Sequence, residues 1–312
     1  MTHFQVKTTD LLTNDEIAGL TSLFETVFHK PCPRDVFERK FGGNCLGRSV
    51  HSLMFLEGEM IGAFSAIPVR YNFFGRTVLF ANTADLMIDP AHRGSVARVR
   101  RLAEGLYKAL AAEGVAFVFC CLRNEVFELH RAISNWRAIG KVHYYVAPFF
   151  GPARLLTRVW NSFFKGTGDK PFPIEKVNDA SFTEYRYRIL PTNYATIDLP
   201  GGGNAVYATE LYYPIGGIPK HVRFGLLIDV SPLTKANVDA AVIRIRKRER
   251  RLHVLAYQGH LPFQPRDMIR VPSKYEKQPW TLAGRILQPD LIDERVFNLE
   301  NWNVNLSNGD LV

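Results

Sequence analysis

The sequence predicts a mixed α/β fold in which antiparallel strands precede a parallel strand–helix–strand unit. An apolar strand over Leu79–Asp89, an amphipathic helix over Val96–Gly114 and a second apolar strand over Val115–Leu122 follow one another. A connection of this length makes the two strands parallel and joins them by a right-handed crossover. The strands His51–Glu57 and Ile61–Phe74 are separated by a short turn that contains glycine, which predicts an antiparallel hairpin.

The N-terminal segment is expected to place helices ahead of this hairpin. Phe4–Thr8 is typical of a short strand. A helix is expected to begin after Thr13, a preferred N-cap residue, with Asp15 and Glu16 in its first turn. A shorter helix, Asp35–Phe41, follows a break that contains two prolines. The elements expected after the parallel unit are a helix over Glu125–Ser134 and a strand over Lys141–Val146.

The second half repeats the strand–helix–strand order. Phe224–Val230, Lys235–Arg250 and Leu252–Tyr257 follow one another like the parts of the first unit, which indicates a diverged structural duplication. The glycine run Gly201–Asn204 lies between strands and not before a helix, so it predicts a hairpin turn rather than a phosphate loop. The strands expected in this half are Glu184–Leu190, Tyr194–Leu199, Ala205–Tyr213 and Val222–Val230.

The length of 312 residues favours two domains. We expect the first domain over residues 1–150 and a second α/β domain over 180–312. The segment 151–179 contains scattered glycine, proline and charged residues, which is typical of a linker.

Composition and charge narrow the class of protein. With 46% hydrophobic and 22% charged residues the chain is typical of a globular protein, and its longest apolar runs are too short to span a bilayer. The N-terminus has no signal-peptide pattern and the four cysteines have no metal or redox spacing, so we expect reduced thiols, no metal and a cytoplasmic location. The formal charge of +9 fits an anionic ligand. Its largest cluster, Arg244–Arg251, is interpreted as the solvated face of a helix, with a nucleic-acid surface as the alternative.

The turn between the first strand and the helix of the parallel unit is the most informative segment. Asp89-Pro-Ala-His-Arg-Gly-Ser95 brings backbone N–H groups to the start of a helix, an arrangement that binds phosphate. Neither a dinucleotide-binding fingerprint nor a Gly-Lys-Ser/Thr phosphate loop occurs in the sequence. The order of the elements and the pattern strand–Asp89-Pro-x-x-Arg93-Gly94–helix resemble the GNAT (GCN5-related N-acetyltransferase) superfamily over about Phe4–Val146.

This resemblance implies a fold, a co-substrate and a set of binding residues. The expected fold is the GNAT acyl-CoA N-acyltransferase fold with a second, diverged GNAT-like domain, and the expected co-substrate is acetyl-CoA. The turn would bind the pyrophosphate, and main-chain groups at the end of the strand would pair with the pantetheine amides. The family usually has glycines where this chain has Val96 and Arg98, so Arg98 either serves as a charged phosphate partner or marks weakened binding. The residues expected to bind acetyl-CoA are Met87, Ile88, Arg93, Gly94, Ser95, Val96, Ala97, Arg98 and Asn124.

Two residues are candidates for proton transfer. Asp85, near the end of the strand, is the best candidate for the base that takes the amine proton, directly or through water, and an edge or capping carboxylate is the alternative. His130 is near the position of a tyrosine acid in many family members, but it also falls on the apolar stripe of its helix, which favours a packed histidine. Asn124 is equally well interpreted as a helix N-cap.

The acceptor is narrowed by weaker similarities. Phe37–Phe41, Glu184–Arg188 and Trp302–Asp310 are similar to segments of larger GNAT proteins of bacterial polysaccharide biosynthesis. The similarity implies an amino sugar, free or nucleotide-linked, as the amine substrate. The alternatives are transfer to an amino acid or a protein amine, and a non-catalytic acyl-CoA-binding regulatory protein. A homodimer is left open, and nucleic acid is not an expected partner.

Overall fold

The computed structural model describes residues 1–309 except 45, 163–169, 190–192, 210–221 and 277–279. The helices are α1 (Asn14–Phe28), α2 (Arg34–Gly42), α3 (Val96–Ala112), α4 (Asn124–Ser134), α5 (Gly151–Ser162), α6 (Ala180–Glu184) and α7 (Lys235–Arg248). The strands are β1 (Thr2–Thr8), β2 (Val50–Leu56), β3 (Glu59–Phe73), β4 (Arg76–Ile88), β5 (Val115–Leu122), β6 (Arg137–Pro148), β7 (Ile174–Lys176), β8 (Ala195–Asp198), β9 (Asn204–Ala208), β10 (Phe224–Ser231), β11 (Val254–Gly259), β12 (Ile269–Arg270) and β13 (Trp280–Ile286). Short helical turns used below are η2 (Pro90–His92), η3 (Tyr185–Ile189) and η7 (Leu306–Asn308).

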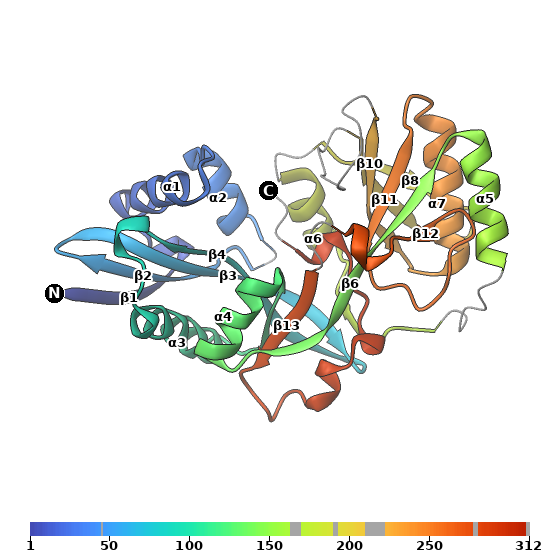
Figure 1. The fold of residues 1–312 in the computed structure, drawn as a ribbon. Coiled ribbons are helices and arrows are strands. Elements are labelled where there is room, and N and C mark those ends of the chain that lie inside the picture. Colours follow the sequence, from blue (N-terminus) through green and yellow to red (C-terminus); the bar gives the residue numbers. More distant parts are fainter. Residues whose placement is uncertain (45, 163–169, 190–192, 210–221, 277–279, 310–312) are drawn as a thin grey trace.

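One sheet runs through both halves of the described chain. The strand order is β1-β2-β3-β4-β5-β13-β6-β11-β10-β9-β8, with β7 beside β3 and β12 beside β6. Figure 1 shows α1 and α2 on one face of the first half of the sheet and α3 and α4 on the opposite face. No described helix is long and apolar enough to cross a membrane.

Local signals in the sequence account for the first half. The capping box predicted for α1 is present: the Thr13 hydroxyl accepts from the Glu16 N–H at 3.2 Å, and the Glu16 carboxylate accepts from the Thr13 N–H at 2.8 Å. The hairpin β2–β3 is antiparallel and the pair β4–β5 is parallel, as the sequence predicts. Gly114 follows α3 with a φ of +84°, a conformation that glycine adopts without strain.

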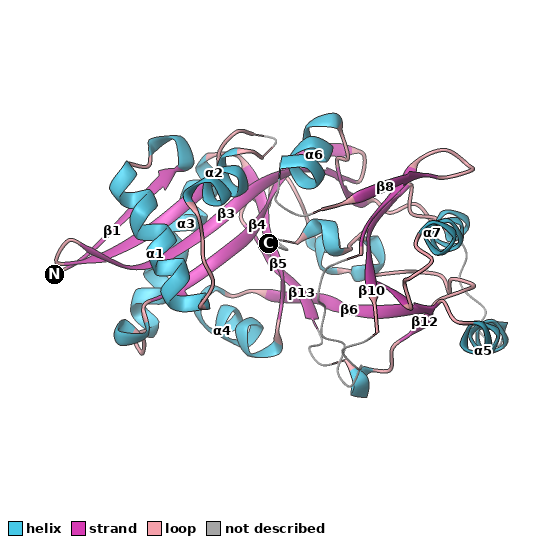
Figure 2. Cartoon of the chain, turned by 90° about the horizontal axis from the view of Figure 1, so that it is seen from above, coloured by secondary structure: helices cyan, strands magenta, loops and turns pink. Residues whose placement is uncertain are grey.

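The two halves share strands across the predicted domain boundaries. β13, encoded near the C-terminal end of the described chain, lies antiparallel between β5 and β6 and completes the first half of the sheet. β6 pairs with β13 through its first residues and with β11 through its last, and Figure 2 shows it passing from one half into the other. The division into 1–150 and 180–312 stays a prediction, and the sheet is continuous across it.

The second half has the unit expected from the repeat. β10 and β11 are parallel and α7 connects them, so the predicted strand–helix–strand order is confirmed here. The first strand of each unit is irregular. The register of β10 against β9 shifts between Leu227 and Asp229, and the register of β4 against β3 also shifts. Asp229 forms a buried ion pair with Lys176 at 3.1 Å, and Asp85 of β4 forms one with Lys40 at 2.9 Å. These shared features support a structural duplication.

Two segments differ from the sequence prediction. The predicted strand Glu184–Leu190 is wrong over its described part: it comprises the end of α6 and one π-helical turn, η3. Its alternation of tyrosine and arginine has the period of a strand, but Tyr185, Arg186 and Tyr187 are all buried because this turn packs between the halves. The segment 151–179, predicted as a linker, instead contains α5 and β7.

The basic cluster on α7 is partly used within the fold. Val238, Ala241, Val242 and Ile245 form the buried stripe, as predicted. On the other face Arg244 and Arg248 donate to the carbonyl groups of Asp198 and Thr196 next to them. Cys32, Cys120 and Cys121 form no disulfide, and the predicted free thiol of Cys45 lies outside the described residues.

Candidate functional site

β4 contains a bulge at the candidate base. Ala84 of β4 pairs with Ser65 and Met87 pairs with Ala63, so Asp85 and Leu86 together face a single residue of β3. Asp85 has a φ of +49°, which is uncommon for a residue other than glycine and is best tolerated by Asp and Asn. Backbone strain of this kind collects at functional sites, so it draws attention to this end of β4.

β4 and β5 part just before the bulge. Their described pairing ends at Asn82 and Phe119, although the two strands continue to Ile88 and Leu122. The Asp89 N–H donates to the Ile61 carbonyl at 2.9 Å, and antiparallel alternation therefore turns the main-chain groups of Ile88 away from β3. The open edge of β4 thus presents a main-chain N–H to the space between the strands.

The two predicted pantetheine partners differ in their orientation. The carbonyl of Ile88 accepts from Arg93 Nε at 3.2 Å. The Arg93 side chain therefore reaches from the turn to the open edge of β4. Met87 pairs with Ala63, and its side chain is buried in the core beneath α1. The alternation of the strand therefore suits Ile88, and not Met87, for main-chain contact with a ligand between β4 and β5.

The turn that follows β4 exposes a helix N-terminus. Gly94 has a φ of +105°, and a Cβ added to it would meet no atom within 4 Å, so the turn is open on this side. The Ser95 hydroxyl caps α3 by accepting from the Arg98 N–H at 3.4 Å. The N–H groups of Val96 and Ala97 stand in the first turn of α3, where no helical carbonyl is available to them. Together with the helix dipole they make an anion site at the surface.

The non-glycine residues of this turn leave it accessible. The Val96 side chain is 55% exposed, and Arg98 is partly exposed. Neither side chain covers the helix N-terminus from inside the fold. The residues present fit a pyrophosphate group, with Arg93 and Arg98 as the cations beside it.

Asn124 lies on the other side of the opening, just after β5. It is the first residue of α4, and Arg123 is the N-cap, so the N-cap interpretation of Asn124 is wrong. Its side-chain oxygen accepts from the Thr281 hydroxyl of β13 at 3.4 Å. The contact ties this rim of the opening to the inserted strand.

Asp85 is paired with a lysine that sequence reasoning missed. Lys40 Nζ of α2 lies 2.9 Å from Asp85 Oδ2, and both side chains are mostly buried. The ammonium also lies over the rings of Phe24 and Phe41. The Tyr185 hydroxyl donates to the Lys40 carbonyl at 2.7 Å, which connects the pair to η3 of the second half.

His130 lies apart from Asp85, across the sheet. Its ring is buried between Phe64 and Trp136, with ring centroids 5.6 and 4.6 Å away. Burial lowers the pKa of His130 to about 4, so the ring is neutral at physiological pH. Phe64 belongs to the core beneath α3, whereas Asp85 contacts α2 on the other face. These surroundings favour the packed histidine over a proton donor.

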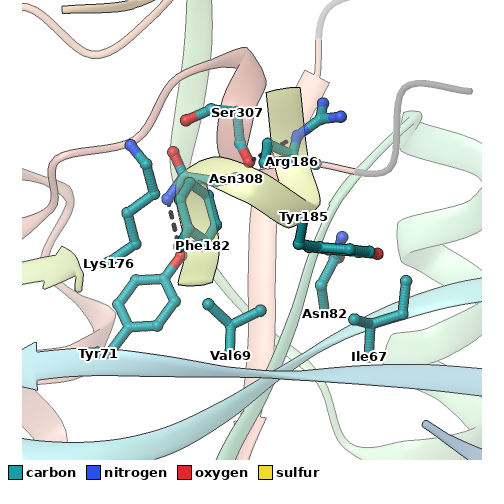
Figure 3. Close-up of a pocket in the computed structure, with 11 residues that line it drawn as sticks. Ile67, Val69, Tyr71, Asn82, Lys176, Phe182, Tyr185, Arg186, Ser307 and Asn308 are labelled. Atoms are coloured by element: carbon teal, nitrogen blue, oxygen red, sulfur yellow. Dashed lines mark hydrogen bonds between the residues drawn. The ribbon is translucent and has the colours of Figure 1, made fainter. Parts of the chain in front are cut away.

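A small pocket opens beside the end of the β4–β5 pairing (Figure 3). We call it the β4 pocket; its volume is about 30 Å³. It lies on the α1–α2 side of the sheet and is closed by residues of η3 and η7. Its lining residues are Ile67, Val69, Tyr71, Asn82, Lys176, Phe182, Tyr185, Arg186, Ser307, Asn308 and Gly309.

A larger cavity of about 780 Å³ lies elsewhere, between α5 and the strands β6, β11 and β12. Its lining is apolar except for Thr157 and Arg270, and it includes none of the predicted site residues. No group of three or more potential metal ligands occurs in the described part of the chain.

The comparisons with known proteins agree with this geometry. Residues 8–121, which include β4, the turn and most of β5, match the family model for the acetyltransferase (GNAT) domain. No curated protein shows significant similarity to the sequence.

Three solved structures are similar over most of the chain. A probable N-acyltransferase from Enterococcus faecalis has a TM-score of 0.60 and 13% identity, covering 92% of this chain and 73% of its own. A GCN5-related N-acetyltransferase from Anabaena variabilis has a TM-score of 0.60 and 12% identity, covering 91% and 73%. The N-myristoyltransferase of Saccharomyces cerevisiae, solved with bound myristoyl-CoA, has a TM-score of 0.53 and 9% identity, covering 91% and 82%.

At these identities the structures show the fold alone. The predicted mixed α/β fold of the GNAT type is therefore confirmed. The domain match over 8–121, together with this fold, supports an acetyltransferase.

Proposed function

We propose that the protein transfers an acetyl group from acetyl-CoA to a primary amine of a small molecule. The observation that carries the proposal is the parting of β4 from β5 after Asn82, directly before the exposed N-terminus of α3. The opening offers main-chain groups to an extended thioester, and the helix N-terminus offers N–H donors to its phosphates.

The reaction needs the chain to stabilise an oxyanion and to accept a proton from the amine. The amine nitrogen attacks the thioester carbonyl, the C–S bond breaks, coenzyme A leaves as a thiolate, and the amine loses a proton. The N–H of Ile88 at the open edge of β4 is our candidate for stabilising the oxyanion. Asp85 is our candidate for the proton acceptor, directly or through water. We assign no proton transfer to His130, because its ring is enclosed between Phe64 and Trp136 and a neutral imidazole is only a very weak acid.

For the acceptor we propose an amino sugar, free or nucleotide-linked, as the first class to test. The support is the similarity of short segments to proteins of polysaccharide biosynthesis, together with the basic character of the chain. Amino acids and protein amines form the second class. In each case the amine would approach through the β4 pocket, which lies within a few residues of Asp85 along β4.

A thiol-release assay tests the proposal. The protein is incubated with acetyl-CoA and a panel of amino sugars, nucleotide-linked amino sugars, amino acids and a lysine peptide, and free coenzyme A is measured. We expect release that depends on one class of amine and acetylated product in equal amount. Binding of coenzyme A is followed in parallel by calorimetry. Absence of both binding and release would contradict the proposal.

A second candidate function is acyl-CoA binding without catalysis. Val96 and Arg98 in place of glycines favour it, as does the engagement of Asp85 by Lys40. The same experiment separates the two functions, because a sensor binds the thioester and leaves it intact with every amine.

A further inference from the structure

The β4 pocket contains an excess positive charge among its described residues. Lys176 is neutralised by Asp229, which lies 3.1 Å away and is itself held by the Tyr187 hydroxyl at 2.7 Å and the Asn305 amide at 2.8 Å. Arg186 is the other cation, and none of the eleven lining residues is acidic. The pocket thus holds one guanidinium more than its described carboxylates balance.

Arg186 is buried with part of its donor capacity unused. Its side chain is only 3% exposed. Nε donates to the Ser307 carbonyl at 3.3 Å and Nη2 to the Leu306 carbonyl at 3.4 Å. Nη1 is buried and has no hydrogen-bond partner in the described part of the protein. A buried charge without a counter-ion is destabilising, so a ligand anion that reached Nη1 would be bound favourably.

Asn82 supplies a second unsatisfied group, of the opposite kind. It is 5% exposed, and its side-chain oxygen is buried with no hydrogen-bond partner among the described residues. It is also the last residue of β4 that pairs with β5, so it borders the opening proposed for the thioester. With the amide oriented as it is, this oxygen accepts a hydrogen bond from an amine.

We infer that the β4 pocket binds an acceptor whose amine donates to Asn82 and whose anionic oxygen group pairs with Arg186. Figure 3 shows Asn82 extending from the sheet and Arg186 belonging to the helical turn above it, so the two lining residues come from different elements. The inference rests on the proposed acetyl transfer and narrows its acceptor. Amines that carry a carboxylate or a phosphate are favoured over neutral amino sugars.

The size of the pocket favours the carboxylate. A volume of about 30 Å³ accepts about two water-sized groups, which is the size of a carboxylate rather than of a sugar ring. The amine nitrogen on Asn82 and the anionic group on Arg186 would then be enclosed, and the ring or side chain of the acceptor would extend toward the surface.

Matched pairs of amines test the inference. One arm compares amino acids with their amides, and a second compares amino-sugar phosphates with the free amino sugars. For the anionic member of the productive arm we expect kcat/KM to be about 10- to 100-fold higher, the range of a hydrogen bond to a charged group. A preference in the first arm indicates that the pocket binds a carboxylate, and a preference in the second arm indicates that it binds a phosphate. Equal rates within both arms would overturn the inference.

Two variants locate the effect. Arg186→Gln should abolish the preference for the anionic amine mainly through KM, and Arg186→Lys should retain part of it. Arg188→Gln is the matched control, since Arg188 is exposed on the same turn and pairs with Glu184. A preference that persists in a folded Arg186→Gln protein would overturn the assignment to Arg186. If Arg186→Gln does not fold, the inference is tested by Arg186→Lys and by the matched pairs of amines with the wild-type protein.

Calorimetry keeps this inference separate from the proposed function. Each amine is titrated into the protein without acetyl-CoA. Tighter binding of the anionic members that is lost in Arg186→Gln supports the pocket even if no thiol is released. Release of thiol with neutral and anionic amines alike supports acetyl transfer and refutes the pocket assignment.

Discussion

The buried pair Lys40–Asp85 leads to the sharpest prediction. The pair joins α2 to the bulge of β4, and the exposed fractions of the two side chains are 7% and 12%. Asp85→Asn removes the negative charge but retains a hydrogen-bond acceptor, and asparagine tolerates the φ of +49°. The buried Lys40 ammonium then loses its ion pair with Asp85.

The expected magnitudes follow from this burial. Breaking a buried ion pair on one side costs about 3–5 kcal/mol in the free energy of unfolding. Asp85→Ala should cost about 1–2 kcal/mol more than Asp85→Asn, because alanine is strained in the left-handed conformation. The double variant Lys40→Met/Asp85→Asn removes both charges of this pair, so its loss should be at least about 2 kcal/mol smaller than the sum of the single losses.

Urea denaturation of the wild type, both single variants and the double variant measures this cycle. Glu184→Gln is the control, because the exposed pair Arg188–Glu184 should contribute less than about 0.5 kcal/mol. Thiol release by Asp85→Asn is measured below its unfolding transition, where we expect turnover to fall by about 10²- to 10⁴-fold with unchanged affinity for coenzyme A. Single variants within 1 kcal/mol of the wild type, on the order of ordinary surface changes, would refute the stability reasoning. Unchanged turnover would remove Asp85 from the mechanism.

Three further predictions concern other parts of the structure. Burial lowers the pKa of His130 from 6.5 to about 4. The free energy of unfolding should therefore be highest above pH 6.5 and should fall by about 3 kcal/mol as the pH is lowered to 4. Unfolding of His130→Phe should show only part of this pH dependence, and the rest should come from His51, whose pKa is lowered to about 3. Gly94→Val should weaken coenzyme A binding in calorimetry, whereas Gly58→Val, with a similar positive φ in the β2–β3 turn, should strain the fold by a comparable amount and leave binding intact. Gly284→Ala should lower the free energy of unfolding by about 1–3 kcal/mol, because the added Cβ would lie 2.4 Å from Phe117 Cζ and the Val118 carbonyl; a wild-type value would argue against the insertion of β13.

Much of the first half could be predicted because its signals are local. The capping box at Thr13 and Glu16, the apolar stripe of α3 and the apolar run of β5 each specify an element within a few residues. The turn at Gly94 could be predicted for the same reason. The position of β13 could not, because pairing between strands far apart in the chain leaves no short-range pattern in either one.

The candidate site divides in the same way. Asp85 and the turn follow from a contiguous motif, whereas Lys40 and Arg186 reach the site from elements distant in the sequence. The strand predicted over 184–190 concealed Arg186, because alternating tyrosines resemble a half-buried strand when their neighbours are unknown. Only the fold shows that the arginine between them is also buried and lines the pocket.

The late position of β13 in the chain has a consequence for biosynthesis. Proteins that fold during translation usually complete their N-terminal domain first. Here β5 and β6 leave the ribosome without the strand that separates them, and that strand is translated only after β8 to β12 of the second half. Unpaired strand edges associate readily with other chains. The facing edges of β5 and β6 therefore stay open until Ile286 has been translated, and the sheet of the first half is completed only after most of the second half has been made.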